Sequence, residues 1–285
     1  MRIRVADIPM NIEVTDTAFF DRRFAAYRDG GDAPVQFSMT STVTDIITPP
    51  VGEEYRTFRR THLLRLPDGK QCYYTTAPTG RIAYLAQYAP AYESVDMWIS
   101  PRGEPFSNTD YEYMYTGYEF SSRLGYLGGG VLHGSAIAYR GRGVIFSAPS
   151  GTGKSTHTGL WKACFGEDVV FVNDDKPAIR YPDGQATVYG TPWSGKTDLN
   201  TNMAAPLHAI VFVERGEENR IRRLELTESM LHLSEELVRP RHDEALSTRL
   251  VDVMVQLAQT VPVYLLTCNM DPAAATVARD GIFGK

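Results

Sequence analysis

The feature that most constrains this fold is the run "GVIFSAPSGTGKSTHTGLWKACF", residues 143–165. A short apolar segment ends at Ser147, a tight turn with two glycines follows, and a helix-compatible stretch begins at Lys154. A buried strand, a glycine-containing loop and a helix in this order point backbone N–H groups and a helix N-terminus at an anion. The order predicts an α/β (α+β) core with a phosphate-binding loop of the Walker A type, "APSGTGKS", at residues 148–155.

A second stretch, "GTPWSGKT" at residues 190–197, matches the pattern G-x-x-x-x-G-K-[ST] letter by letter, whereas the first has Ala148 in place of the leading glycine. The residues after the second stretch, "DLNTNMAAP", are poor helix formers. Pro192 and Trp193 make that loop stiff and bulky where a backbone should approach a phosphate. We therefore expect the imperfect match to bind phosphate and the perfect match not to. Ala148 is tolerable if its position needs no positive φ.

The first loop carries the residue types that phosphoryl transfer needs. Lys154 would reach the β- and γ-phosphates, and the Ser155 hydroxyl would ligate Mg²⁺. ATP and Mg²⁺ are therefore the expected nucleotide and metal. The predicted nucleotide-binding residues are Ser150, Gly151, Thr152, Gly153, Lys154, Ser155 and Thr156.

The apolar run "VVFVNDD", residues 169–175, ends in two carboxylates at the same edge of the expected sheet. Adjacent residues of a strand point to opposite faces, so Asp174 and Asp175 should have different roles. We assign Asp174 to the metal, with Ser155, and Asp175 to general-base catalysis on the acceptor hydroxyl. The reverse assignment stays open, and so does a plain surface turn at "NDD".

The order "LHG" at 132–134, "GRGVIFSAPSGTGKS" at 141–155 and "NDD" at 173–175 resembles the kinase core of HPr kinase/phosphorylase. It is equally similar to the ATP-binding core of ATP-dependent phosphoenolpyruvate carboxykinase, in which an "HCSA"-like segment precedes the loop and "DD" follows it. The resemblance implies that His133 lies by the metal or the catalytic carboxylate. It also implies that Lys196 and Thr197 belong to an active-site loop that faces the phosphate loop. Lys196 as a solvated loop residue is the alternative.

The sequence departs from both families. HPr kinase has an acidic residue where this chain has Thr156, and neither its C-terminal glycine-rich signature nor the carboxykinase's oxaloacetate-binding arginine segment is found. What the resemblance implies is an HPr-kinase-like phosphotransferase acting on a hydroxyl of a peptide, a protein or a small molecule that the sequence does not identify. A non-catalytic nucleotide sensor is the alternative from another class, and ATP or pyrophosphate hydrolysis is a weaker one.

Charge and composition narrow the partners. The net charge of -5 argues against a nucleic-acid partner. The three cysteines are far apart, which is typical of reduced thiols. No apolar run is long enough to cross a bilayer and no signal-peptide pattern is found, so we expect a cytoplasmic protein with no membrane partner. A homo-oligomer is an open alternative.

We divide the chain into a β-rich module at residues 1–125, a candidate acceptor-binding module, and a kinase core with C-terminal helices at 126–285. Tyrosines and a methionine at helical spacing in "DYEYMYTGYEF", residues 110–120, predict a helix whose aromatic stripe faces the core, with a binding platform as the alternative. Residues 227–259 predict two helices separated at Pro240. We expect His157 on the surface of the helix after the phosphate loop.

Overall fold

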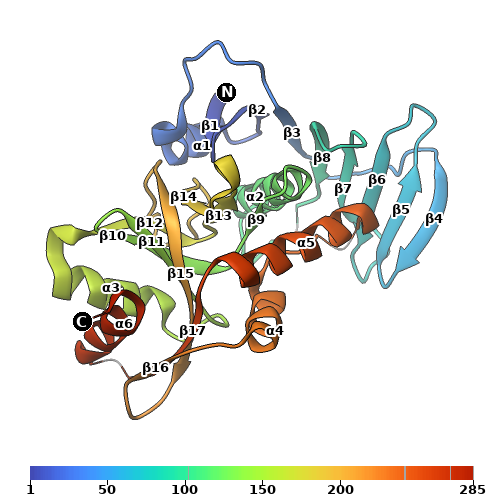
Figure 1. The fold of residues 1–285 in the computed structure, drawn as a ribbon. Helices are drawn as coiled ribbons and strands as arrows, with labels where there is room; N and C mark the ends of the chain where they lie inside the picture. Colours follow the sequence, from blue (N-terminus) through green and yellow to red (C-terminus); the bar gives the residue numbers. More distant parts are fainter. Residues whose placement is uncertain (102, 241, 270, 285) are drawn as a thin grey trace. The chain divides into compact units, whose positions relative to one another are not determined.

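The computed structural model describes residues 1–101, 103–240, 242–269 and 271–284. The chain forms two compact units: Met1–Leu127 with Pro240–Ser247, and Gly128–Arg239 with Thr248–Lys285. Each unit contains a large sheet of parallel and antiparallel strands together with helices, so the protein is mixed α+β (Figure 1). The main division falls at Leu127–Gly128, and the segment Pro240–Ser247 returns to the first unit.

The first unit is built on an eight-stranded sheet in the order β1-β2-β3-β8-β7-β6-β5-β4. β3 is parallel to both β2 and β8, and every other pairing is antiparallel. Residues 53–65 of the predicted β-rich module form a hairpin that turns at Arg59 and Arg60. The strands are β1 (Arg2–Val5), β2 (Ile8–Glu13), β3 (Phe37–Val43), β4 (Glu53–Phe58), β5 (Thr61–Arg65), β6 (Gln71–Thr76), β7 (Ile82–Tyr88) and β8 (Ser94–Ile99).

Helix α2 (Asn108–Tyr126) begins at a capping box in which the Ser107 side chain accepts from the Asp110 N–H. The predicted helix is present, but the prediction that its aromatic stripe faces the core is wrong. The buried face instead carries Glu119, Phe120 and Leu124, while Met114 is 41% exposed. The stripe instead lines a cavity of the first unit. Tyrosine suits such a position because its ring can stay half-buried while its hydroxyl forms a hydrogen bond. The unit also contains α1 (Thr17–Arg23) and the 3₁₀ turn η1 (Ala25–Tyr27).

The second unit is built on a nine-stranded sheet in which the order β12-β10-β11-β15-β14-β13-β9 is extended by β17 beside β15 and by β16 beside β17. β11, β15 and β17 run parallel, and β10 and β11 are buried almost throughout, as the continuous apolar runs predict. The strands are β9 (Gly130–Val131), β10 (Gly134–Tyr139), β11 (Arg142–Ser147), β12 (Val169–Asp175), β13 (Ala178–Arg180), β14 (Thr187–Tyr189), β15 (Ala204–Arg215), β16 (Arg220–Arg223) and β17 (Val263–Cys268).

Two helices pack their apolar sides on this sheet around Trp161, which is fully buried. They are α3 (Lys154–Phe165) and α6 (Ala273–Phe283), and they lie side by side at the lower left of Figure 1. The predicted pair of helices around Pro240 is also present, as α4 (Leu226–Glu236) and α5 (Glu244–Thr260). The remaining 3₁₀ turns are η2 (Gly166–Asp168) and η3 (Pro182–Gly184).

The predicted exposure of His157 is wrong. It is 2% exposed, packs against Phe146, and its Nε2 accepts from the Trp161 indole N–H at 3.1 Å. The side of α3 that carries His157 therefore faces the sheet. Among the described residues, no helix has both the length and the apolar character needed to cross a membrane.

Candidate functional site

The loop after β11 has the backbone geometry that its sequence predicts. Gly151 and Gly153 adopt φ of 80° and 121°, which an L side chain rarely accepts. Ala148 is buried and its φ is not positive, so the missing first glycine of the pattern costs nothing. Helix α3 starts directly after Gly153 with no side-chain cap, which leaves its first N–H groups for another acceptor.

Lys154 lies at the base of this loop and is 9% exposed. Its ammonium donates to the Ala148 carbonyl at 2.6 Å. Burial lowers the pKa of Lys154, while the nearby carboxylates of Glu236, Asp175 and Asp174 act in the opposite direction. The lysine is thus a partly desolvated cation with three acids around it, a surrounding that favours a polyanion together with a metal ion.

Asp174 joins the two look-alike stretches. The Ser155 hydroxyl donates to one of its carboxylate oxygens at 2.8 Å, and the Thr197 hydroxyl donates to the other at 2.9 Å. Ser155 and Thr197 are the last letters of "GTGKS" and "WSGKT". The second stretch does not begin a helix, as predicted. Its Thr197 is hydrogen-bonded to Asp174, the same carboxylate that accepts from Ser155 of the first stretch.

Asn173 fixes the second stretch against β12. Its buried side-chain amide donates to the Thr191 carbonyl at 2.8 Å, and its oxygen accepts from the Lys176 N–H at 2.6 Å. Gly195 comes so close that an added Cβ would lie 3.1 Å from the Cβ of Asp175, and its φ is +64°. Only a glycine allows this approach, so the residue before Lys196 is set by contact with the acid strand.

Asp175 belongs to a second polar group on the same strand end. His133 Nε2 lies 3.6 Å from an Asp175 oxygen, and its Nδ1 lies 2.9 Å from Glu236 Oε2. The Lys176 ammonium also forms an ion pair with Asp175. His133 is further held by its backbone N–H, which donates to the Glu236 carbonyl at 2.9 Å. An imidazolium would satisfy both carboxylates, whereas a neutral ring could donate to only one of them.

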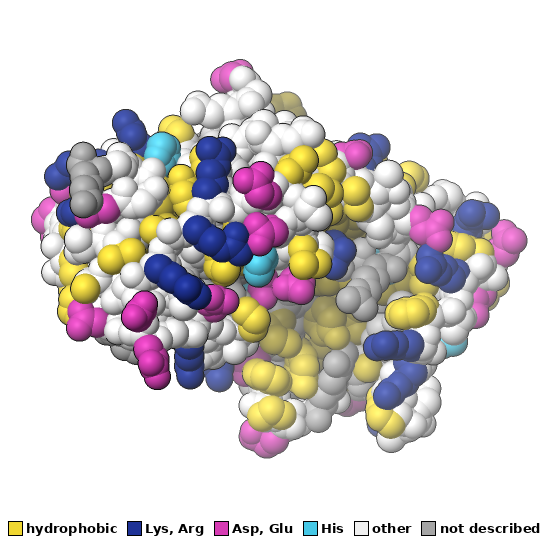
Figure 2. Space-filling model, turned by 60° about the horizontal axis from the view of Figure 1, so that its bottom comes forward, with side chains coloured by type: hydrophobic (Ala, Val, Ile, Leu, Met, Phe, Trp, Pro, Cys, Tyr) yellow, Lys and Arg dark blue, Asp and Glu magenta, His cyan; other side chains and the backbone are white. Residues whose placement is uncertain are grey.

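The phosphate loop, the two aspartates and the second stretch line one cavity of about 520 Å³. On the face drawn in Figure 2, acidic and basic side chains of the described residues lie beside each other. The cavity is lined by His133, Gly134, Ser150, Gly151, Gly153, Lys154, Ser155, Thr156, Asp174, Asp175, Gly195, Lys196, Thr197 and Arg215. It therefore gathers every predicted site residue except Thr152.

Two residues that the sequence does not mark as functional, Arg215 and Glu236, contact the site residues, Arg215 through the loop at Thr152 and Glu236 through His133. The Thr152 carbonyl accepts from Arg215 at 3.1 Å, and the Gly151 carbonyl accepts from the same guanidinium at 2.6 Å. Arg215 ends β15, the parallel neighbour of β11, so a correct strand order would have placed it at this edge. Glu236 ends α4 and gives no local signal in the sequence.

The donor set fits Mg²⁺. Asp174 and the Ser155 and Thr197 hydroxyls supply hard oxygen atoms, which this ion prefers. Among the residues that the structure describes, no cluster of three or more His, Cys, Asp or Glu side chains could hold a metal. A site completed by phosphate oxygens and water, as is usual for Mg²⁺, is compatible with what is present.

Comparison with known proteins gives the family. Residues 118–273 match the family described as SynChlorMet cassette protein ScmC, and this segment is more than half of the chain. The chain belongs to the ScmC family. The matched ScmC segment contains the entire cavity described above.

One solved structure with partial similarity is the Hpr(Ser) kinase/phosphatase from Coxiella burnetii. It is 13% identical, the match covers 53% of this chain and 94% of that chain, and the TM-score is 0.33. A TM-score this low does not establish a shared fold, so the HPr-kinase-like core stays a prediction. No curated protein matches the sequence.

Proposed function

We propose that the second unit is an ATP- and Mg²⁺-dependent kinase that transfers the γ-phosphoryl group to a hydroxyl. The observation that carries the proposal is the meeting of Ser155 and Thr197 on the two oxygens of Asp174, beside Lys154 and in one cavity. A glycine loop, a lysine, an oxygen donor set and a second carboxylate are the parts from which phosphoryl-transfer sites are built.

Binding and charge neutralisation fall to the loop. The N–H groups around Gly151 and Gly153 and the start of α3 would hold the phosphates, and Lys154 would exchange its carbonyl partner for a β- or γ-oxygen. Arg215 holds the loop by donating hydrogen bonds to two of its backbone carbonyls. Lys196, exposed on the facing loop, would add positive charge over the transferred group.

Asp174, Ser155 and Thr197 would hold Mg²⁺. The bound ion would neutralise the charge that develops on the phosphate oxygens. The two hydroxyls also set the rotamer of Asp174, since each of its oxygens is already engaged by a donor.

Asp175 would be the general base. As the acceptor oxygen forms its bond to the γ-phosphorus, the bond from that phosphorus to the leaving ADP oxygen breaks, and the acceptor's proton passes to Asp175. His133, braced by Glu236, orients this carboxylate from one side and Lys176 pairs with it from the other. The carboxylate is therefore pre-positioned by residues that need not touch the substrate.

The test combines radiolabelled ATP, Mg²⁺, a library of Ser- and Thr-containing peptides, and water as an acceptor. Asp175→Asn should keep nucleotide binding and lose transfer by about 100-fold or more, the usual contribution of a general base. Lys154→Ala should weaken nucleotide binding itself. Asp168→Asn and Lys162→Ala, exposed substitutions of the same kinds in this unit, are the matched controls and should change neither.

The same experiment separates the alternatives. A nucleotide sensor would bind ATP through Lys154 and show no turnover that depends on Asp175. Transfer by Asp175→Asn at the rate of the unaltered protein would contradict the assigned base. Unchanged binding by Lys154→Ala would contradict the phosphate loop.

A further inference from the structure

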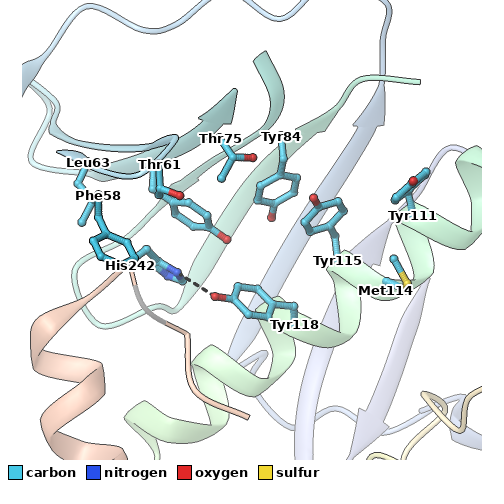
Figure 3. A pocket seen from close by; sticks show the side chains of 11 residues that line it. Phe58, Thr61, Leu63, Thr75, Tyr84, Tyr111, Met114, Tyr115, Tyr118 and His242 are labelled. Atoms are coloured by element: carbon cyan, nitrogen blue, oxygen red, sulfur yellow. Dashed lines mark hydrogen bonds between the residues drawn. The ribbon is translucent and has the colours of Figure 1, made fainter. Parts of the chain in front are cut away.

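The first unit has a cavity of its own, about 340 Å³ in volume, between its sheet and helix α2 (Figure 3). This volume is at the small end of the range for ligand pockets, about 300–1,000 Å³, and suits a single bulky side chain. Aromatic rings form most of its wall. The lining residues are Phe58, Thr61, Leu63, Tyr73, Thr75, Tyr84, Tyr111, Met114, Tyr115, Tyr118 and His242.

A buried carboxylate accepts the hydroxyl protons of two tyrosines that line the cavity. Glu119 is fully buried and accepts from the Tyr73 hydroxyl at 2.6 Å, from the Tyr84 hydroxyl, and from the Tyr92 hydroxyl at 2.5 Å. Tyr73 and Tyr84 line the cavity, but their hydroxyl protons are already donated to Glu119. What they offer to a ligand is ring surface.

His242 completes this wall from the returning segment Pro240–Ser247. Because the Tyr92 proton is donated to Glu119, the Tyr92 oxygen accepts from His242 Nε2–H at 3.0 Å. Nδ1 then carries no proton and accepts from the Tyr118 hydroxyl at 3.4 Å, the bond drawn in Figure 3. Burial lowers the pKa of His242 to about 3, which agrees with a neutral ring. The ring also stacks on Tyr73 with a centroid separation of 3.8 Å.

The mouth of the cavity is apolar and then basic. Phe58 and Met114 are 45% and 41% exposed at its edge. Arg59 and Arg60 follow Phe58 at the exposed tip of the β4–β5 hairpin, and the Arg59 guanidinium lies 5.5 Å from the Phe58 ring centroid. Among the described residues that line the cavity there is no Asp, Glu, Lys or Arg, and His242 is neutral. A ligand that matches these surroundings is apolar where it enters and negatively charged beside the entrance.

We propose that this cavity is a peptide-docking site that takes one aromatic side chain of an acidic peptide segment, with carboxylates of that segment against Arg59 and Arg60. The carboxylates would pair with the guanidinium groups of the exposed hairpin tip that follows Phe58, where each interaction is modest and salt-dependent. The aromatic ring supplies most of the affinity, since aromatic rings form most of the wall and the polar atoms of Tyr73, Tyr84 and His242 are already hydrogen-bonded within the protein. The proposal deepens the proposed function by giving a peptide acceptor a docking point, and it rests on that function only for the role of the peptide as acceptor.

The test measures binding without nucleotide, so its outcome is independent of phosphoryl transfer. The probe is fluorescein-labelled Gly-Gly-Asp-Phe-Asp-Gly-Gly, followed by fluorescence anisotropy with the full chain. We expect binding that weakens at least tenfold when Phe is replaced by Ala, a change that cannot affect the folding of the protein. Replacement of both Asp by Lys should also weaken binding. Equal binding of the Phe and Ala peptides would overturn the docking site.

Two variants locate the site. Met114→Trp fills the mouth and should reduce binding at least tenfold, whereas Val51→Trp, at a position of the same unit that is 89% exposed, should not. The double substitution R59E/R60E should reduce binding of the acidic peptide and reverse its preference over the Lys peptide. The matched double substitution R220E/R223E on β16 should leave both unchanged. Full binding by Met114→Trp, or an unaltered preference in R59E/R60E, would place the peptide elsewhere and contradict the proposal.

Discussion

Replacing Asn173 tests whether the second stretch is fixed on the acid strand. Asn173 is fully buried, and its side chain makes close hydrogen bonds to the Thr191 carbonyl and from the Lys176 N–H. Asn173→Ala removes both and leaves those two backbone groups without this partner. A lost hydrogen bond costs about 1 kcal/mol and an unpaired buried group about 1–3 kcal/mol, so we expect a loss of about 2–4 kcal/mol in unfolding free energy.

The assay is thermal unfolding of the full chain by calorimetry. At about 2–4 °C per kcal/mol for a unit of this size, the transition of the second unit should fall by about 5–15 °C. Asn219→Ala is the matched control, because its side chain accepts one bond, from the Asn269 N–H, in a more open position. It should shift the transition by much less. A shift of Asn173→Ala no larger than that of the control would refute the claim that Asn173 holds the loop.

Three further predictions concern the same unit. Burial lowers the pKa of His157 to about 4, so as the pH falls the histidine becomes protonated in the unfolded chain before it does in the folded protein. The unfolding free energy, measured by urea titration, should therefore decrease between pH 6.5 and 4. This decrease should be smaller in His157→Gln. Gly195→Ala should displace Asp175, because of its φ of +64° and the 3.1 Å approach, and should lower phosphoryl transfer more than ATP affinity. Glu236→Gln should lower kcat with little change in ATP affinity, because Glu236 acts through His133; an unchanged kcat would contradict that role.

The parts of the site that are local in sequence could be predicted. The strands that end at Ser147 and Asp175 show as continuous apolar runs, although β12 is an edge strand with Val170 exposed, and the helix after Lys154 follows from its residues. The absence of a helix after Thr197 follows from the run of Asp, Asn and Pro there. Each of these depends on side-chain and backbone preferences within a few residues.

The parts that depend on packing between distant segments could not be predicted. Glu236 reaches His133 only because α4 ends beside β9, where Leu132 pairs with Leu237 in an isolated bridge. His157 lies between two polar threonines, and nothing in that context shows that Trp161 and Phe146 cover it. The tyrosine stripe of α2 has the spacing of a core face, yet the face that is buried is the one centred on Glu119.

Calorimetric titration of ATP into the full chain, with and without Mg²⁺, tests the proposed ATP and Mg²⁺ site most directly. We expect Mg²⁺ to strengthen ATP binding, Asp174→Asn to abolish this gain while ATP still binds, and Lys154→Ala to weaken binding in both conditions. Equal ATP binding with and without Mg²⁺ would contradict the Mg²⁺ site at Asp174. ATP binding by Lys154→Ala as strong as that of the unaltered chain would contradict the nucleotide site at Gly151.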